Sequence, residues 1–228
     1  MSTATIFGAS GGLARALSHE LLGHGWQVNA VCRAARAECV RQEFDPQIRA
    51  HQMHLHSVES EYTEFEFSRP SDLVILTQAL FEPASLTAMA SEAITDEVSV
   101  GLTDPILITR SFLRAFPSIP GVRRNICFIG STSAYAGFKD TSIYCAVKHG
   151  LLGFVRAMND EYAATDDRFW LFSMGTMLTD MGSKVRGQDA STYLQPQDVA
   201  QRIVSAILSP SNLFEPEVII RRRTVKFL

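Results

Sequence analysis

The sequence has few features that would direct the chain out of a reducing, aqueous compartment. Its four cysteines form no Cys-x-x-Cys pair and have no spacing typical of metal ligands. No basic region precedes an apolar segment at the N-terminus, and no apolar run approaches the roughly 18 residues that span a bilayer. We therefore expect free thiols, no metal site, no membrane contact and a cytoplasmic protein.

The sequence also lacks an excess of charge of either sign. Its 21 Lys and Arg residues nearly balance 24 Asp and Glu residues, which gives a formal net charge of -3 over 228 residues. A net charge this small produces no strong field for nucleic acid. The basic run Arg221-Arg222-Arg223 follows three apolar residues, so we interpret it as the exposed end of a C-terminal strand rather than as a binding site.

Short buried strands alternate with amphipathic helices along the chain. Strands are predicted at residues 4–7, 27–32, 48–56, 73–76, 125–129, 169–173 and 217–220. Helices are predicted at residues 13–22, 35–44, 95–116, 142–162 and 197–208. We expect Asp45-Pro46 to end the second helix and Pro105 to bend or break the third.

This alternation implies a parallel sheet with right-handed crossovers, in one domain that spans residues 1–228. Residues 182–196 are polar and lack periodicity. A loop of this length in a compact domain is usually functional or mobile, and we expect a substrate loop at residues 181–196.

A glycine-rich turn links the first predicted strand to the first helix. Gly8 permits a tight turn, Gly12 permits a close approach of the backbone to a pyrophosphate, and Ala14 permits helix and strand to pack. The N-terminus of the helix supplies free amide donors. The alternative is an ordinary turn that happens to be rich in glycine, but the position between strand and helix favours a dinucleotide site.

The end of the second strand favours NADP over NAD. Dinucleotide folds that bind NAD usually place an acid here, which accepts hydrogen bonds from the ribose 2′-hydroxyl. This chain has Cys32 and Arg33 instead, with Arg36 just beyond, and a guanidinium can pair with a 2′-phosphate. The alternative is that both arginines are solvated loop residues.

Three residues in the middle of the chain can make a proton-transfer site. Tyr144 and Lys148 are four residues apart in a predicted helix and therefore share one face. The lysine ammonium would favour the phenolate and lower the pKa of the tyrosine from its usual value of about 10. Ser131 follows the fifth strand, at the edge where ligands bind in open α/β sheets. A second match, Tyr135 with Lys139, lies in a loop-like stretch, where Tyr135 would form a pocket wall or a surface aromatic.

Over nearly its whole length, the chain resembles the classical short-chain dehydrogenase/reductase family. Its glycine motif is similar to residues 7–14, with the first Thr and last Gly of the motif replaced. The family's Ser, Tyr and Lys match Ser131, Tyr144 and Lys148, including the usual 13-residue gap from Ser to Tyr. Its Pro-Gly motif after the sixth strand matches Met174-Gly175, and the Thr downstream of that motif matches Thr179.

The resemblance implies a doubly wound, Rossmann-type parallel sheet of about seven strands with helices on both faces. It implies an NADP-dependent oxidoreductase that transfers hydride between the nicotinamide and a carbonyl or alcohol substrate. Tyr144 would be the general acid/base, Lys148 would bind the ribose and tune Tyr144, and Ser131 would stabilise the developing alkoxide. The family assembles as a homodimer or homotetramer through the helices at residues 95–116 and 142–162. The expected cofactor-binding residues are Gly8, Ser10, Gly11, Gly12, Leu13, Arg33, Thr77, Gln78, Ala79, Tyr144, Lys148, Gly175 and Thr179.

The chain departs from the family at three places. The Asn-Asn-Ala-Gly segment reads Thr-Gln-Ala-Leu at residues 77–80, and His56-Ser57 replaces the usual Asp. Gly101 aligns with the Asn that supports a water chain to the lysine, so proton relay needs another route. These departures motivate an alternative function, an NADP(H)-binding sensor or scaffold with little or no turnover.

The expected substrate pocket is mostly apolar or neutral, which favours a moderately hydrophobic carbonyl compound. Two cations in its loop, Lys184 and Arg186, can meet an anionic group, but we favour solvated loop charges. The predicted lining consists of Ser133, Tyr135, Phe138 and residues 181–194.

Overall fold

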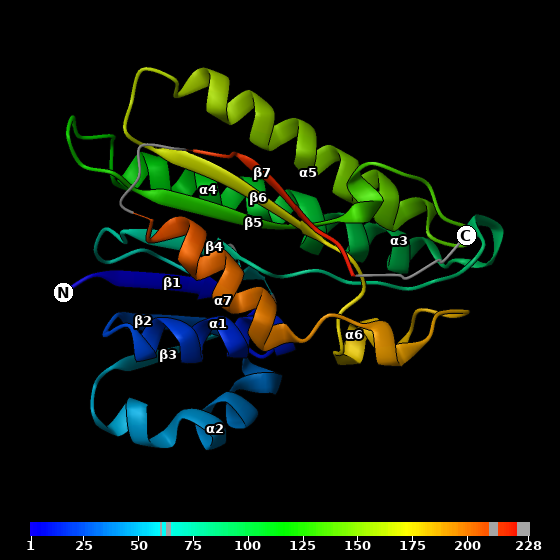
Figure 1. The fold of residues 1–228 in the computed structure, drawn as a ribbon, viewed down its shortest axis with the longest axis horizontal. Helices are drawn as coiled ribbons and strands as arrows, with labels where there is room; N and C mark the ends of the chain where they lie inside the picture. The colour runs from blue at the N-terminus through cyan, green and yellow to red at the C-terminus, as the bar shows by residue number, and fades with distance from the viewer. Residues whose placement is uncertain (60, 63–64, 210–213, 223–228) are drawn as a thin grey trace.

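The computed structural model describes residues 1–59, 61–62, 65–209 and 214–222, which form one seven-stranded parallel sheet between two helical layers (Figure 1). The strand order is β3-β2-β1-β4-β5-β6-β7. The strands are β1 (Thr3–Phe7), β2 (Gln27–Arg33), β3 (Met53–Val58), β4 (Leu73–Leu76), β5 (Asn125–Ser131), β6 (Arg168–Met174) and β7 (Glu217–Ile220). The predicted doubly wound, Rossmann-type parallel sheet is confirmed.

One helical layer contains α1 (Gly12–Gly23), α2 (Ala37–Arg49) and α7 (Pro196–Ile207). The other contains α3 (Ser91–Val98), the π-helical segment η4 (Ser99–Thr103), α4 (Asp104–Ala115) and α5 (Ser142–Glu161). Each layer buries its own apolar core against the sheet, with Leu17 and Ile203 in the first and Phe112 and Val155 in the second. The sheet is therefore apolar on both faces, as a parallel sheet requires. Short 3₁₀ turns lie in the connections between these elements. They are η1 (Ala34–Arg36), η3 (Leu86–Ala88) and η5 (Thr132–Ala134).

The predicted interruption of the second helix at Asp45-Pro46 is confirmed, but a helical segment follows it that the sequence did not predict. The chain kinks at Phe44, where φ is -109° and ψ is 17°, and α2 reaches Arg49 with this kink inside it. The kink places Pro46 in the first turn of a new helical segment, where its missing N–H costs no hydrogen bond. The third strand consequently begins at Met53 rather than at residue 48.

The predicted break near Pro105 is confirmed as a change of helix type. The helix begins at Ser91, passes through η4 and resumes as α4, where Pro105 occupies the first turn. Gly101 lies in this π-helical segment and packs on α5.

The segment predicted as a loop at residues 182–196 contains two short helical turns, α6 (Asp180–Ser183) and η6 (Ala190–Thr192). Arg222, which follows β7, packs on this segment and donates to Thr192 Oγ1 at 3.0 Å. Arg222 is therefore half-buried and not simply an exposed strand end, whereas Arg223 lies outside the described residues. Within the described residues, every helix is too short or too polar to cross a membrane.

Candidate active site

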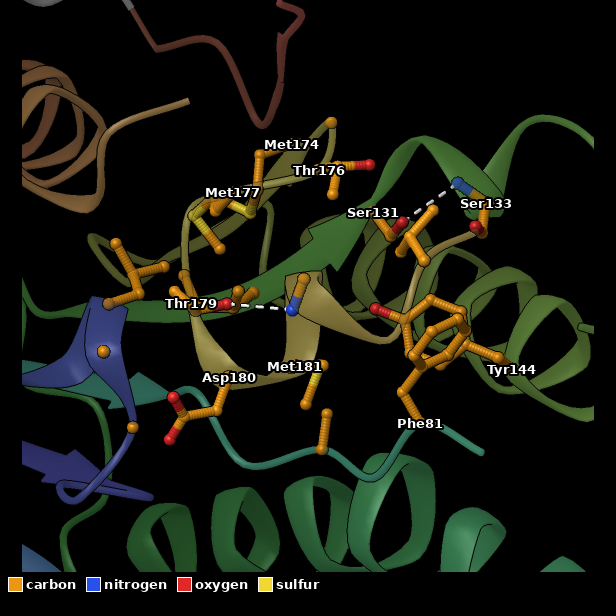
Figure 2. A pocket seen from close by; sticks show the side chains of 18 of the residues that line it. Phe81, Ser131, Ser133, Tyr144, Met174, Thr176, Met177, Thr179, Asp180 and Met181 are labelled. Carbon is orange, nitrogen blue, oxygen red and sulfur yellow. Dashed lines mark hydrogen bonds between the residues drawn. The ribbon is translucent and has the colours of Figure 1, made fainter. Parts of the chain in front are cut away.

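A cavity of about 870 Å³ opens at the carboxyl edge of the sheet, above β1, β4, β5 and β6. The glycine turn lies at one end and the three candidate catalytic residues at the other. Figure 2 shows Ser131, Ser133 and Tyr144 on one side of this cavity, across from the segment that carries Thr179, Asp180 and Met181. The predicted groups therefore converge on one space.

The glycine turn is built for close packing of backbone against backbone. Gly8 has a φ of +78°, and a Cβ there would lie 2.7 Å from Thr77 Oγ1 and 3.0 Å from the backbone nitrogen of Gln78. A Cβ on Gly12 would lie 2.9 Å from Thr179 Cγ2. No carboxylate or side-chain hydroxyl caps the N-terminus of α1, so its first amides remain available to a ligand.

Three guanidinium groups line the cavity near the end of β2. They belong to Arg33, Arg36 and Arg15, of which sequence reasoning did not assign Arg15. Arg15 forms an ion pair with Glu43 at 2.7 Å, and this pair ties α1 to α2. The cavity lining also contains two carboxylates, Asp140 and Asp180, neither of which belongs to β2.

Lys148 is the most deeply buried cation at the site. It is 2% exposed, and its ammonium donates to the carbonyl oxygen of Ile129 at 2.9 Å. The same ammonium lies 5.5 Å from the centroid of the Tyr144 ring, so the two side chains share one face of α5 as predicted. Ser131 ends β5 and precedes the 3₁₀ turn η5. Its Oγ accepts a hydrogen bond from the backbone N–H of Ser133 at 3.1 Å.

Burial dominates the electrostatics of these residues. It raises the pKa of Tyr144 to about 12, while the Ser131 hydroxyl acts in the opposite direction. Burial also lowers the pKa of Lys148 to about 8, against the carboxyl of Glu97, which raises it. The predicted lowering of the pKa of Tyr144 is therefore not found, because desolvation of the phenolate outweighs the hydrogen bond with Ser131 and the carboxyl of Glu97 raises the pKa further.

An aromatic ring covers Tyr144. Phe81, on the loop after β4, contacts Tyr144 edge to face with the ring centroids 4.9 Å apart (Figure 2). Lys184 fastens this loop to the α6 segment, donating to the carbonyl oxygen of Phe81 at 3.1 Å and to Glu82 Oε2 at 3.2 Å. Lys184 is therefore an exposed loop charge, as predicted, but it is ion-paired with Glu82 and does not line the cavity. Sequence reasoning missed Phe81, because it follows the segment that departs from the family pattern.

Most of the predicted site residues line the cavity. They are Ser10, Gly11, Gly12, Leu13, Arg33, Thr77, Ala79, Ser131, Tyr144, Lys148, Gly175 and Thr179. Gly8 instead shapes the turn beneath it, and the side chain of Gln78 is buried away from it, with neither amide atom hydrogen-bonded among the described residues.

The predicted substrate pocket needs two corrections. Tyr135 is not a wall of the cavity, because its hydroxyl donates to Glu217 Oε2 at 3.1 Å on β7. From residues 181–194, the cavity is lined by Met181, Gly182 and residues 185–188, and not by the rest. Ser133, Phe138 and Arg186 do line it, as predicted.

Comparisons with known proteins agree with this geometry. The sepiapterin reductase of Chlorobaculum tepidum is 33% identical over 97 residues, which are 42% of this chain and 40% of that reductase. The (S)-benzoin-forming benzil reductase of Bacillus subtilis is 27% identical over 202 residues, which are 82% of this chain and 79% of that enzyme.

A solved structure has the same fold. The alcohol dehydrogenase of Thermococcus sibiricus, complexed with 5-hydroxy-NADP, superposes with a TM-score of 0.83 at 20% identity and covers 97% of both chains. The short chain dehydrogenase family matches residues 2–190. The chain therefore belongs to the short-chain dehydrogenase/reductase family.

Proposed function

We propose that the protein is an NADP-dependent oxidoreductase that interconverts a carbonyl compound and the corresponding alcohol. The observation that carries the proposal is the convergence of Ser131, Tyr144 and Lys148 on a cavity that continues to the glycine turn and three arginines. The membership of the family supports the reaction class. Several proteins of the same fold have been solved with NADP or NADPH, which supports the choice of cofactor.

The residues present fit a dinucleotide. Gly12 lets α1 approach Thr179, since a Cβ there would lie 2.9 Å from Thr179 Cγ2, and the N-terminus of α1, where Gly11 provides no side-chain cap, offers amide donors to a pyrophosphate. Arg33 and Arg36 would pair with the 2′-phosphate of NADP, since guanidinium groups recognise phosphate through two parallel hydrogen bonds. The bound cofactor would supply or accept the hydride at its nicotinamide ring.

The protein's own side chains would supply the proton chemistry. A pKa near 12 keeps the Tyr144 phenol protonated at neutral pH, which is the form that donates a proton to a carbonyl oxygen during reduction. Ser131 would donate to the same oxygen. Lys148 uses one of its three N–H donors on Ile129, and its charge would stabilise the phenolate left after proton transfer.

The cavity favours a substrate with an apolar body. Phe81, Phe138, Met181 and Val185 line the space around Tyr144, which would bury a hydrophobic group beside the reacting carbonyl. Arg186 also lines the cavity and would accommodate an anionic substituent on the substrate.

The test begins with titration of the purified protein with NADPH and with NADH, followed by nucleotide fluorescence. We expect tighter binding of NADPH, and NADPH oxidation with at least one apolar carbonyl compound. The Tyr144→Phe variant should bind NADPH as the parent does and turn over about 10²- to 10⁴-fold more slowly, the usual contribution of general acid catalysis. Equal turnover by this variant would remove Tyr144 from the reaction.

The alternative, a sensor or scaffold that binds NADP(H) without chemistry, predicts a different result from the same experiment. It requires tight NADPH binding that Tyr144→Phe does not change, and no NADPH oxidation across a broad panel of carbonyl compounds. Binding of neither nucleotide would reject both functions, because both depend on the glycine turn.

A further inference from the structure

Glu97 on α3 is a buried carboxyl without a conventional partner. It is 1% exposed, and neither carboxyl oxygen reaches a partner with full hydrogen-bond geometry among the described residues. The backbone N–H of Glu82 acts on this carboxyl and lowers its pKa. Buried Glu residues are rare unless they are paired, because burying a carboxylate without compensation is costly. Its retention here requires an explanation.

The groups that face Glu97 come from three elements. Helix α5 contributes Tyr144 and Lys148, the loop after β4 contributes Glu82, and the segment after α6 contributes Lys184. Burial raises the pKa of Glu97 to about 7, and the carboxylate of Glu82 raises it further, whereas both lysines lower it. Helix α3, which carries Glu97, packs on α5, which carries Lys148, and the exposed Lys184–Glu82 ion pair acts on the same carboxyl.

The approach of Glu97 to Lys148 depends on close packing of two helices. A Cβ on Gly101, one helical turn after Glu97, would lie 2.6 Å from Cγ1 of Val147, the residue before Lys148. On the opposite helix, a Cβ on Gly150 would lie 2.9 Å from Leu102 Cδ2. The two glycines let α3 and η4 pack directly on α5. The glycine that replaces the family Asn is thus part of the arrangement that brings a carboxyl to the lysine.

We propose that Glu97 is the internal counter-charge of Lys148, a positioning residue that keeps the ammonium charged while Tyr144 transfers its proton. The inference rests on the proposed function for its catalytic meaning, but the coupling of the two side chains does not need turnover to be measured. Glu97 acts through Lys148 and touches neither substrate nor nicotinamide.

The sign of the effect follows from charge. An ionised carboxyl favours the ammonium and raises the lysine pKa, which burial otherwise lowers. Removing that carboxylate lets Lys148 lose its proton at lower pH. Because the charged lysine stabilises the phenolate of Tyr144, the rate of carbonyl reduction then declines at lower pH as well.

The kinetic test compares Glu97→Gln with the parent across pH 5.5–9.5. We expect the midpoint of the alkaline decline in kcat to fall by about one pH unit, the low end of shifts caused by a neighbouring opposite charge, with kcat near pH 6 retained. Glu92→Gln is the matched control, because Glu92 is an exposed residue on the same helix. An unchanged midpoint overturns the proposal, and so does a uniform loss of kcat with the same midpoint, which indicates a purely structural role.

A second measurement works even if no substrate is found or Glu97→Gln does not fold. The protein is labelled with ¹³C at the glutamate carboxyls and titrated by NMR, first with Lys148 intact and then in Lys148→Met. We expect one carboxyl that titrates near neutral pH, and a higher midpoint for it in Lys148→Met, because a positive charge has been removed. No such carboxyl, or an identical midpoint in both proteins, overturns the coupling. A coupled carboxyl in a protein without any carbonyl turnover would instead reject the proposed function alone.

Discussion

Two buried cations lie at opposite ends of the same sheet and have very different hydrogen-bond partners. Arg124 precedes β5 at the amino end, where its guanidinium donates to both carboxylate oxygens of Asp167 at 2.7 and 2.6 Å and also to the carbonyl oxygen of Phe116. Among the described residues, the hydrogen bond of Lys148 at the carboxyl end goes to Ile129, and the nearby helix α3 carries the buried carboxyl of Glu97, which forms no ion pair with it.

The difference distinguishes an ion pair that stabilises the fold from charged groups that can take part in function. A pair with its hydrogen bonds satisfied holds β5 and β6 together and has no capacity left for a ligand. Glu97 and Gln78 have buried polar atoms without a hydrogen-bond partner among the described residues, which costs stability and leaves groups that can respond to a substrate. Gln78 follows β4 at the carboxyl end of the sheet, so unsatisfied polar groups occur at the functional end, although Gln47 on α2 shows that they are not confined to it.

The largest effect on stability should come from the amino end. Asp167→Asn leaves the buried guanidinium of Arg124 without its counter-charge, and breaking such a pair costs about 3–5 kcal/mol of unfolding free energy. Urea unfolding followed by circular dichroism measures the loss, with Asp160→Asn on the exposed surface of α5 as the control. At a temperature where the variant stays folded, its affinity for NADPH should equal that of the parent. A stability within 1 kcal/mol of the parent would contradict the structural role of the pair.

Arg33 should show the opposite pattern, a loss of affinity without a loss of stability. If its guanidinium pairs with the 2′-phosphate, Arg33→Ala should weaken NADPH binding by about 10- to 100-fold, since hydrogen bonds to charged groups contribute roughly 1.5–3 kcal/mol. NADH binding, measured by the same fluorescence titration, should not change. Arg41→Ala on the exposed side of α2 is the control. An equal loss for both nucleotides would place Arg33 elsewhere in the site and remove the argument for NADP.

The sequence was sufficient for the parts of the site that short spacings encode. The glycine turn needs only the residues around Gly12, and Tyr144 and Lys148 meet because one helical turn separates them. The alternation of strands and helices predicted where these elements lie along the chain for the same reason. Local rules are enough wherever the partners are neighbours in sequence.

Contacts between distant segments could not be predicted in this way. Arg124 and Asp167 are 43 residues apart, and nothing near either residue identifies the other. Tyr135 was expected to line the pocket, but its hydroxyl donates to the carboxylate of Glu217, 82 residues away. Glu97 appears in the sequence as an ordinary helical acid, because its burial depends on how α3 packs on α5. Asp45-Pro46 predicted the interruption at Phe44, but not that the helix resumes after it and reaches Arg49.

The smallest effect concerns the glycines that set the distance between these helices. In an exposed helix, Gly→Ala stabilises a protein by about 0.5–1 kcal/mol, and Gly153→Ala on α5 should do so, because its Cβ would meet nothing within 4 Å. Gly101→Ala should lose that gain and more, since its Cβ would lie 2.6 Å from Val147 and overpacking costs about 1–3 kcal/mol. Thermal unfolding of the two variants gives shifts of opposite sign if α3 and η4 rest on α5 as described. The same Gly101→Ala protein should also show a lower alkaline midpoint in its rate profile, because a displaced α3 carries Glu97 away from Lys148. Stabilisation by both substitutions would mean that the helices do not touch at Gly101, and the counter-charge of Lys148 would then have to come from another residue.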